Sequence, residues 1–215
     1  MIGRPASHTI EGPAGLLETV VDDPKTAAPL GLAVIAHPNP QQGGTLDNKV
    51  VYTLSRAFVL AGWRAVRFNF RGIGRSGGMW DAGVGEVDDM LAVIAHHQGD
   101  PVVRGRPLVL AGFSFGGFVA ARAHARVSPL PQGLILVGPA TSRPDMPAVP
   151  EHTLVVHGEQ DDVVPLSSVL DWARPQSLPI TVVPGVGHFF HGQLPVLREL
   201  VLRHLRATVP AVHSD

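Results

Sequence analysis

The chain has 215 residues, a formal net charge of −1 and a hydrophobic content of 45%. This length favours a single domain over residues 1–215, and the scattered charges argue against a nucleic-acid or membrane partner. The absence of cysteine excludes disulfides, thiolate metal sites and a cysteine nucleophile.

The N-terminus lacks the apolar core of a signal peptide, and no apolar stretch is long enough to span a membrane. We therefore expect a cytoplasmic protein that acts on a small molecule. The sequence leaves its oligomeric state open between monomer and homodimer.

Short apolar runs alternate with helical patterns along most of the chain. The first two runs, Ser7–Glu11 and Leu16–Val21, predict an antiparallel start. The later runs are continuous, as in strands buried on both faces of a parallel sheet. They cover Leu32–Ala36, Ala65–Phe70, Leu108–Phe113, Leu134–Val137, Leu154–Val156 and Ile180–Val183, and the helical patterns cover Asp47–Ala61, Glu86–His97, Phe115–Val127 and Pro195–Leu205.

This order predicts an α/β fold with an eight-stranded, mostly parallel sheet, an antiparallel N-terminal strand and helices on both faces. In such sheets ligands bind at the carboxyl ends of the strands. The residues that directly follow each apolar run are therefore the candidates for chemistry.

A nucleophile elbow is predicted around Ser114. The run that ends at Phe113 leads into Gly112-Phe113-Ser114-Phe115-Gly116 and then into a helical pattern. A serine in a sharp strand-to-helix turn needs small residues two positions away on either side, and glycine meets that need. Ser114 is therefore the candidate nucleophile.

Two further strand ends carry the groups that activate a serine. Asp161 and Asp162 follow the run at 154–156, and His188 follows the run at 180–183. A serine nucleophile requires an imidazole base, and the base requires a carboxylate that orients it. The order serine, acid, histidine along the chain is the order of α/β-hydrolases.

Candidate oxyanion donors lie beside the elbow. One is the backbone N–H of Phe115, the residue after the nucleophile. In the turn after the run at 32–36, Pro38 and Pro40 have no N–H, so Asn39 is the best second donor. We interpret His37 as a brace for this turn.

The motifs GFSFGG, HGEQDDVVP and GVGHFFHG resemble the α/β-hydrolase superfamily. The stretches HPNPQQGGTLDNKVV and FNFRGIGRSGG resemble its small, cap-less, dienelactone-hydrolase-like bacterial branch, and the resemblance extends from about Leu32 to Leu205. It implies Ser114 as nucleophile, His188 as general base and Asp161 as the orienting acid. Asp162 and Asp145 remain alternative acids.

The surroundings of the predicted site bear on its specificity. Only residues 138–152 separate the sixth and seventh runs, too few for a lid domain. Trp80, Phe189 and Phe190 are candidates for an apolar substrate pocket. His188 and His191 lack a third ligand at a recognisable spacing, so we expect neither a metal nor a cofactor.

These features predict a serine hydrolase, most naturally a carboxylesterase for small or flexible esters. Peptidase, thioesterase, lactonase and acyltransferase activities would use the same residues. A non-catalytic binding module of the same fold is the alternative from another class.

Overall fold

The computed structural model describes residues 6–25 and 28–208. Eight strands form one sheet in the order β1-β2-β4-β3-β5-β6-β7-β8. Strand β2 (Gly15–Asp22) runs antiparallel to both of its neighbours, β1 (Ser7–Gly12) and β4 (Arg64–Phe68), and all later pairings are parallel. The predicted mostly parallel sheet with an antiparallel start is confirmed.

The central strands are buried on both faces, which explains their continuous apolar sequences. In β3 (Leu32–Ala36) and β5 (Leu108–Phe113) every residue is buried, and successive side chains enter opposite cores. The remaining strands are β6 (Gly133–Val137), β7 (Leu154–Gly158) and β8 (Thr181–Val183).

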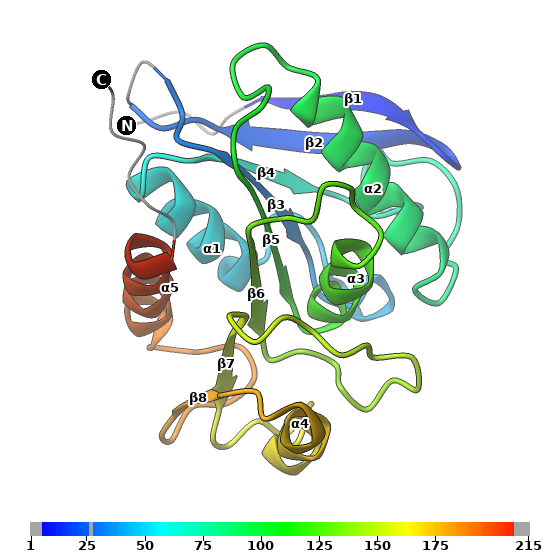
Figure 1. The fold of residues 1–215 in the computed structure, drawn as a ribbon. Helices are drawn as coiled ribbons and strands as arrows, with labels where there is room; N and C mark the ends of the chain where they lie inside the picture. The colour runs from blue at the N-terminus through cyan, green and yellow to red at the C-terminus, as the bar shows by residue number, and fades with distance from the viewer. Residues whose placement is uncertain (1–5, 26–27, 209–215) are drawn as a thin grey trace.

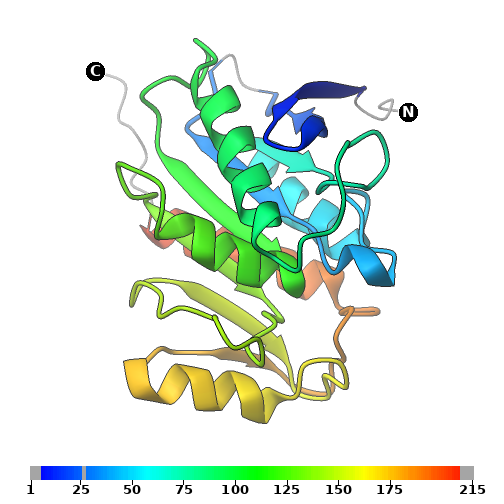
Figure 2. The same ribbon diagram turned by 90° about the vertical axis from the view of Figure 1, so that its right-hand side faces the viewer.

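Helices cover both faces of the sheet (Figures 1 and 2). On one face α1 (Lys49–Leu60) packs beside α5 (Leu194–Thr208). The other face carries α2 (Gly85–Gln98), α3 (Phe115–His124) and α4 (Leu166–Ala173). Short 3-10 turns, η1 (Pro40–Gln42) and η2 (Arg174–Gln176), complete the regular structure of the described residues.

The predicted strand 65–70 ends two residues early, at Phe68. Beyond it the Asn69 N–H donates to the Glu18 carbonyl, and the Phe70 N–H donates to the His37 ring. Helix α4 was not predicted. It has only eight residues and buries Val169 and Ala173, so its apolar pattern is short.

The connection from β6 to β7, residues 138–153, is fully described and contains no helix or strand. The prediction of a fold without a lid is therefore confirmed. Within residues 6–25 and 28–208, no helix is long and apolar enough to cross a membrane.

Strand β3 lies between β4 and β5, so the chain leaves it in one direction and later returns on the other side. Connections that diverge in this way open a crevice at the carboxyl ends of the two strands. Residues 37–44, after β3, and Ser114, after β5, meet at this crevice.

Candidate active site

Ser114 occupies the turn between β5 and α3 in a strained backbone conformation. Its φ is 55° and its ψ is −118°, a region that non-glycine residues rarely adopt. The surrounding backbone holds it there, because the Ser114 N–H donates to the Val137 carbonyl and its own carbonyl accepts from Gly117.

The two glycines of the elbow are required by close backbone contacts. A Cβ at position 112 would lie 2.1 Å from the Gly116 carbonyl oxygen. A Cβ at position 116 would lie 2.3 Å from the carbonyl oxygen of Ala36 and 2.5 Å from that of His37. The elbow therefore packs directly on the loop that follows β3, as the nucleophile-elbow prediction requires.

Asp161 and His188 form a buried hydrogen-bonded pair. His188 Nδ1 lies 2.7 Å from Asp161 Oδ2, and both residues are less than 10% exposed. Because a carboxylate can only accept, Nδ1 carries a proton, and in the neutral ring Nε2 has a free lone pair. That is the tautomer of a general base.

The Asp161 carboxylate is held by its own loop. Its Oδ1 accepts the N–H groups of Val163 at 3.0 Å and Val164 at 2.7 Å. Burial by itself raises the pKa of Asp161. The hydrogen bonds from His188 and Val164 lower it by a larger amount, so the pKa lies below its usual value. Asp161 is therefore an anion at neutral pH.

His157, at the end of β7, supports this loop and was given no role in the sequence analysis. Its Nε2 lies 2.9 Å from the Val164 carbonyl, to which it donates, and 3.5 Å from Asp161 Oδ2. Burial lowers the pKa of His157, so the ring is neutral. Only its place in the HG dipeptide before the acid could have indicated this contact.

The alternative acids lie elsewhere. Asp162 is exposed, and Asp145 is exposed and pairs with Arg122 at 3.8 Å. His191 is exposed, with its ring against Phe189. Within the described part of the chain, no group of three or more histidine, aspartate or glutamate side chains is arranged so that it could hold a metal ion.

Asn39 and Phe115 both lie at the elbow. Phe115 is the first residue of α3, where N–H groups have no partner within the helix. Asn39 precedes η1, and its side chain accepts the Gln41 N–H at 2.9 Å. Within residues 6–25 and 28–208, neither backbone N–H donates to a protein acceptor.

His37 ties the Asn39 turn to the segment that follows β4. Its Nδ1 donates to the Pro38 carbonyl at 2.7 Å, and its Nε2 accepts the Phe70 N–H at 3.1 Å. Burial lowers the pKa of His37 to about 4, although the Pro38 bond acts in the opposite direction. A neutral ring satisfies both bonds, in line with the bracing role inferred from the sequence.

A cavity of about 310 Å³ opens beside Ser114 and His188. The Ser114 hydroxyl makes no hydrogen bond to another described residue, and nucleophile–base bonds are often long in ligand-free structures. The other lining residues are Pro38, Asn39, Gln42, Gly43, Gly44, Asn48, Val163 and Phe189. Gln42, Asn48 and Val163 were not predicted to line the site, although all three lie within the motifs HPNPQQGGTLDNKVV and HGEQDDVVP.

The three predicted aromatic residues have different positions. Phe189 lines the cavity and is 46% exposed. Trp80 does not line it but packs against the Phe115 ring, 4.9 Å between centroids, so its role in binding stays a prediction. The prediction for Phe190 is wrong, because its side chain is fully buried in the core and does not line the cavity; its φ is 53°.

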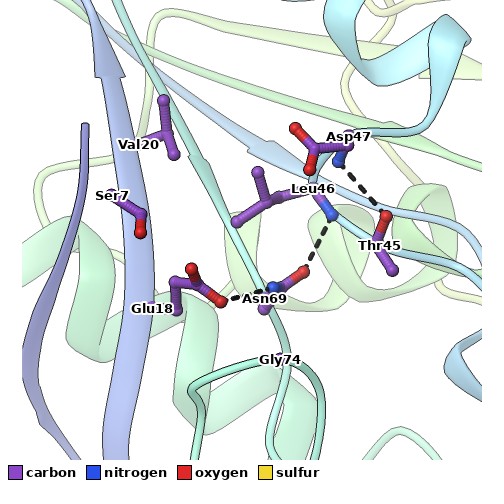
Figure 3. A pocket seen from close by; sticks show the side chains of 8 residues that line it. All are labelled: Ser7, Glu18, Val20, Thr45, Leu46, Asp47, Asn69 and Gly74. Carbon is purple, nitrogen blue, oxygen red and sulfur yellow. Dashed lines mark hydrogen bonds between the residues drawn. The ribbon is translucent and has the colours of Figure 1, made fainter. Parts of the chain in front are cut away.

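A larger cavity, about 460 Å³, is lined by residues 45–47 among others and by neither Ser114 nor His188 (Figure 3). Asn69 crosses its wall, because its Oδ1 accepts the Leu46 N–H at 2.8 Å and its Nδ2 donates to Glu18 at 2.9 Å. This bridge fixes the segment that leads from Gly44 to Asn48. We therefore interpret the residues that line the larger cavity as support for the wall of the active site.

Comparison with known proteins supports the resemblance to the α/β-hydrolase superfamily. Residues 43–177 match the Hydrolase_4 family model, described as serine aminopeptidase S33. The match contains Ser114 and Asp161 and ends before His188. An uncharacterised protein of Rickettsia prowazekii is 30% identical over 172 residues, which cover 74% of this chain and 71% of that protein.

Two solved structures are more similar. An α/β serine hydrolase homologue from Coxiella burnetii shares 38% identity over 95% of this chain and 99% of that chain, with a TM-score of 0.85. An α/β serine hydrolase without a lid from Xanthomonas campestris shares 37% identity over 99% of this chain and 98% of that chain, with a TM-score of 0.88. With a family model that spans more than half of its residues, this chain belongs to the α/β serine hydrolases.

Proposed function

We propose that the protein is a carboxylesterase that works through Ser114, His188 and Asp161. The observation that carries the proposal is the 2.7 Å hydrogen bond between Asp161 and His188 beside the strained Ser114. His188 lines the same cavity as Ser114, and Nε2 is the ring nitrogen that Asp161 leaves free. An imidazole in this state can activate a serine hydroxyl.

The reaction follows from these positions. Ser114 Oγ attacks the ester carbonyl carbon while His188 Nε2 takes the hydroxyl proton, and Asp161 stabilises the imidazolium. The N–H groups of Asn39 and Phe115 hold the negative oxygen of the tetrahedral intermediate. As the C–O bond breaks, His188 passes its proton to the leaving alcohol.

The acyl-enzyme is then hydrolysed by the same groups. His188 takes a proton from water, the hydroxide oxygen attacks the acyl carbon, and the intermediate collapses with the proton returned to Ser114 Oγ. The products are one carboxylic acid and one alcohol, and the enzyme is regenerated.

The family description raises a second candidate, an aminopeptidase. An aminopeptidase must hold the ammonium group of a peptide N-terminus, and a carboxylate close to the serine is the natural partner. No aspartate or glutamate lines the cavity among the described residues. The neutral lining favours an ester over a peptide N-terminus.

The test begins with Ser114→Ala. We expect it to abolish hydrolysis of 4-nitrophenyl butanoate and labelling by a fluorophosphonate probe, while Ser142→Ala, in an exposed loop, leaves both unchanged. A panel of esters, acyl thioesters, lactones and aminoacyl anilides then ranks the substrate classes by kcat/KM. Folded wild-type protein that neither labels nor turns over any substrate would be a binding module, and the proposal would be wrong.

A further inference from the structure

Asn48 lies in the cavity wall, as Phe189 does. It directly precedes α1 and lines the cavity together with Ser114 and His188. The proposed mechanism assigns no step to it. Its side chain is therefore available for substrate recognition.

The orientation of the Asn48 amide is fixed by the helix that it caps. Its Oδ1 accepts the N–H of Val50 at 2.9 Å and that of Val51 at 3.4 Å. These bonds commit the oxygen to α1, so the other end of the amide is the Nδ2 donor. No described residue accepts a hydrogen bond from this nitrogen.

The rest of the lining decides what Asn48 could bind. Among the described residues, none that lines the cavity is an aspartate, glutamate, lysine or arginine. Val163 and Phe189 contribute apolar surface and are both about half exposed, at 46%. A neutral chain with one oxygen acceptor fits this lining better than a charged or a purely hydrocarbon chain.

We infer that Asn48 is a specificity-determining residue, whose Nδ2 donates to an ether, hydroxyl or carbonyl oxygen on one arm of the substrate. The preferred substrates are then neutral esters that carry such an oxygen a few bonds from the scissile carbonyl. This inference rests on the proposed esterase function and adds the substrate class to it.

The first test compares isosteric esters. On the acyl side the pair is 4-nitrophenyl 3-methoxypropanoate and 4-nitrophenyl pentanoate; on the alcohol side it is 2-methoxyethyl acetate and butyl acetate. In each pair an oxygen replaces one methylene. The measured quantity is the ratio of kcat/KM for the oxygen ester to that for the hydrocarbon ester.

Asn48→Ser keeps a capping oxygen for α1 but removes the amide donor. We expect the ratio to fall about fivefold in one of the two pairs, as for the loss of one neutral hydrogen bond. Ratios unchanged in both pairs, in an enzyme that still hydrolyses esters and depends on Ser114, would overturn the inference but not the proposed function.

Asn48→Asp gives an independent test, since aspartate caps a helix as well as asparagine does. It replaces the donor by a carboxylate oxygen. We expect the preference for 2-(trimethylammonio)ethyl acetate over its neutral isostere 3,3-dimethylbutyl acetate to rise about fivefold at low salt and to shrink in high salt.

Gln41→Glu is the matched control, because it adds the same charge at an exposed position outside the cavity lining. If the preference for the cationic ester rose equally in Gln41→Glu and Asn48→Asp, its cause would be the general effect of one added negative charge. That result would contradict the role of Asn48. Melting temperatures of all variants check that the cap and the fold are retained.

Discussion

Replacing Asp161 by asparagine tests the assignment of the acid most directly. The asparagine Oδ1 can still accept the N–H groups of Val163 and Val164, which lie 3.0 and 2.7 Å from the present Oδ1. The Nδ2 group then faces His188 in place of Oδ2. Because an amide N–H donates, His188 Nδ1 must become the acceptor, and the ring proton moves to Nε2.

A protonated Nε2 cannot take the proton of Ser114. From this change of tautomer we expect kcat for 4-nitrophenyl butanoate to fall by about 10³- to 10⁴-fold, which corresponds to an increase of about 4–5.5 kcal/mol in the activation barrier. The two retained backbone bonds should limit the loss of melting temperature to roughly 6 °C.

The matched control is Asp162→Asn, because Asp162 is the exposed neighbour of the acid. It should keep activity within about twofold of wild type. If Asp161→Asn retained more than a tenth of the wild-type kcat, or if Asp162→Asn lost as much activity, the Asp161–His188 pair would not be the activating pair.

Three predictions concern stability. Ser114→Gly should be more stable than Ser114→Ala by about 1 kcal/mol in urea unfolding, because glycine relieves the positive φ that alanine retains; a less stable glycine variant would contradict the strain. Asn69→Ala should lower the free energy of unfolding by about 2 kcal/mol, because it leaves the buried Leu46 N–H without its acceptor. A decrease below about 0.5 kcal/mol would contradict the bridge between Leu46 and Glu18. Burial lowers the pKa values of His37 and His97 to about 4, so both rings stay neutral in the folded state while the unfolded chain takes up protons below about pH 6.5. The free energy of unfolding is thus highest above pH 6.5 and falls toward pH 4, by about 2 kcal/mol per histidine between pH 7 and pH 5. His97→Leu should reduce the slope of the free energy of unfolding against pH. An unchanged slope would contradict a neutral, buried His97.

Local sequence patterns were sufficient for most of the fold. The strands that cross the middle of the sheet contact helices on both faces, so their sequences are continuously apolar and easily recognised. Helix α4 was missed because it lies at the edge of the sheet and buries only Val169 and Ala173. A short helix with so few buried positions leaves little periodicity to detect.

The residues that follow the strands were also predictable, because strand ends converge at one edge of a parallel sheet. Ser114, Asp161 and His188 lie together there, as their order along the chain indicated. The family resemblance favoured Asp161 as the acid, with Asp162 and Asp145 as alternatives. That choice depends on which carboxylate reaches His188, and only the packing of the loop after β7 against the loop after β8 determines it.

The sequence by itself determined the fold class, the elbow with its two glycines and the types of residue at the site. The tertiary structure decided which neighbours face the cavity. Phe189 lines it, while the next residue, Phe190, is fully buried in the core on the face of the sheet that α1 and α5 cover. Asn48 likewise lines the cavity, at the end of a segment that Asn69 contacts at Leu46, and such long-range contacts leave no periodic pattern in the sequence.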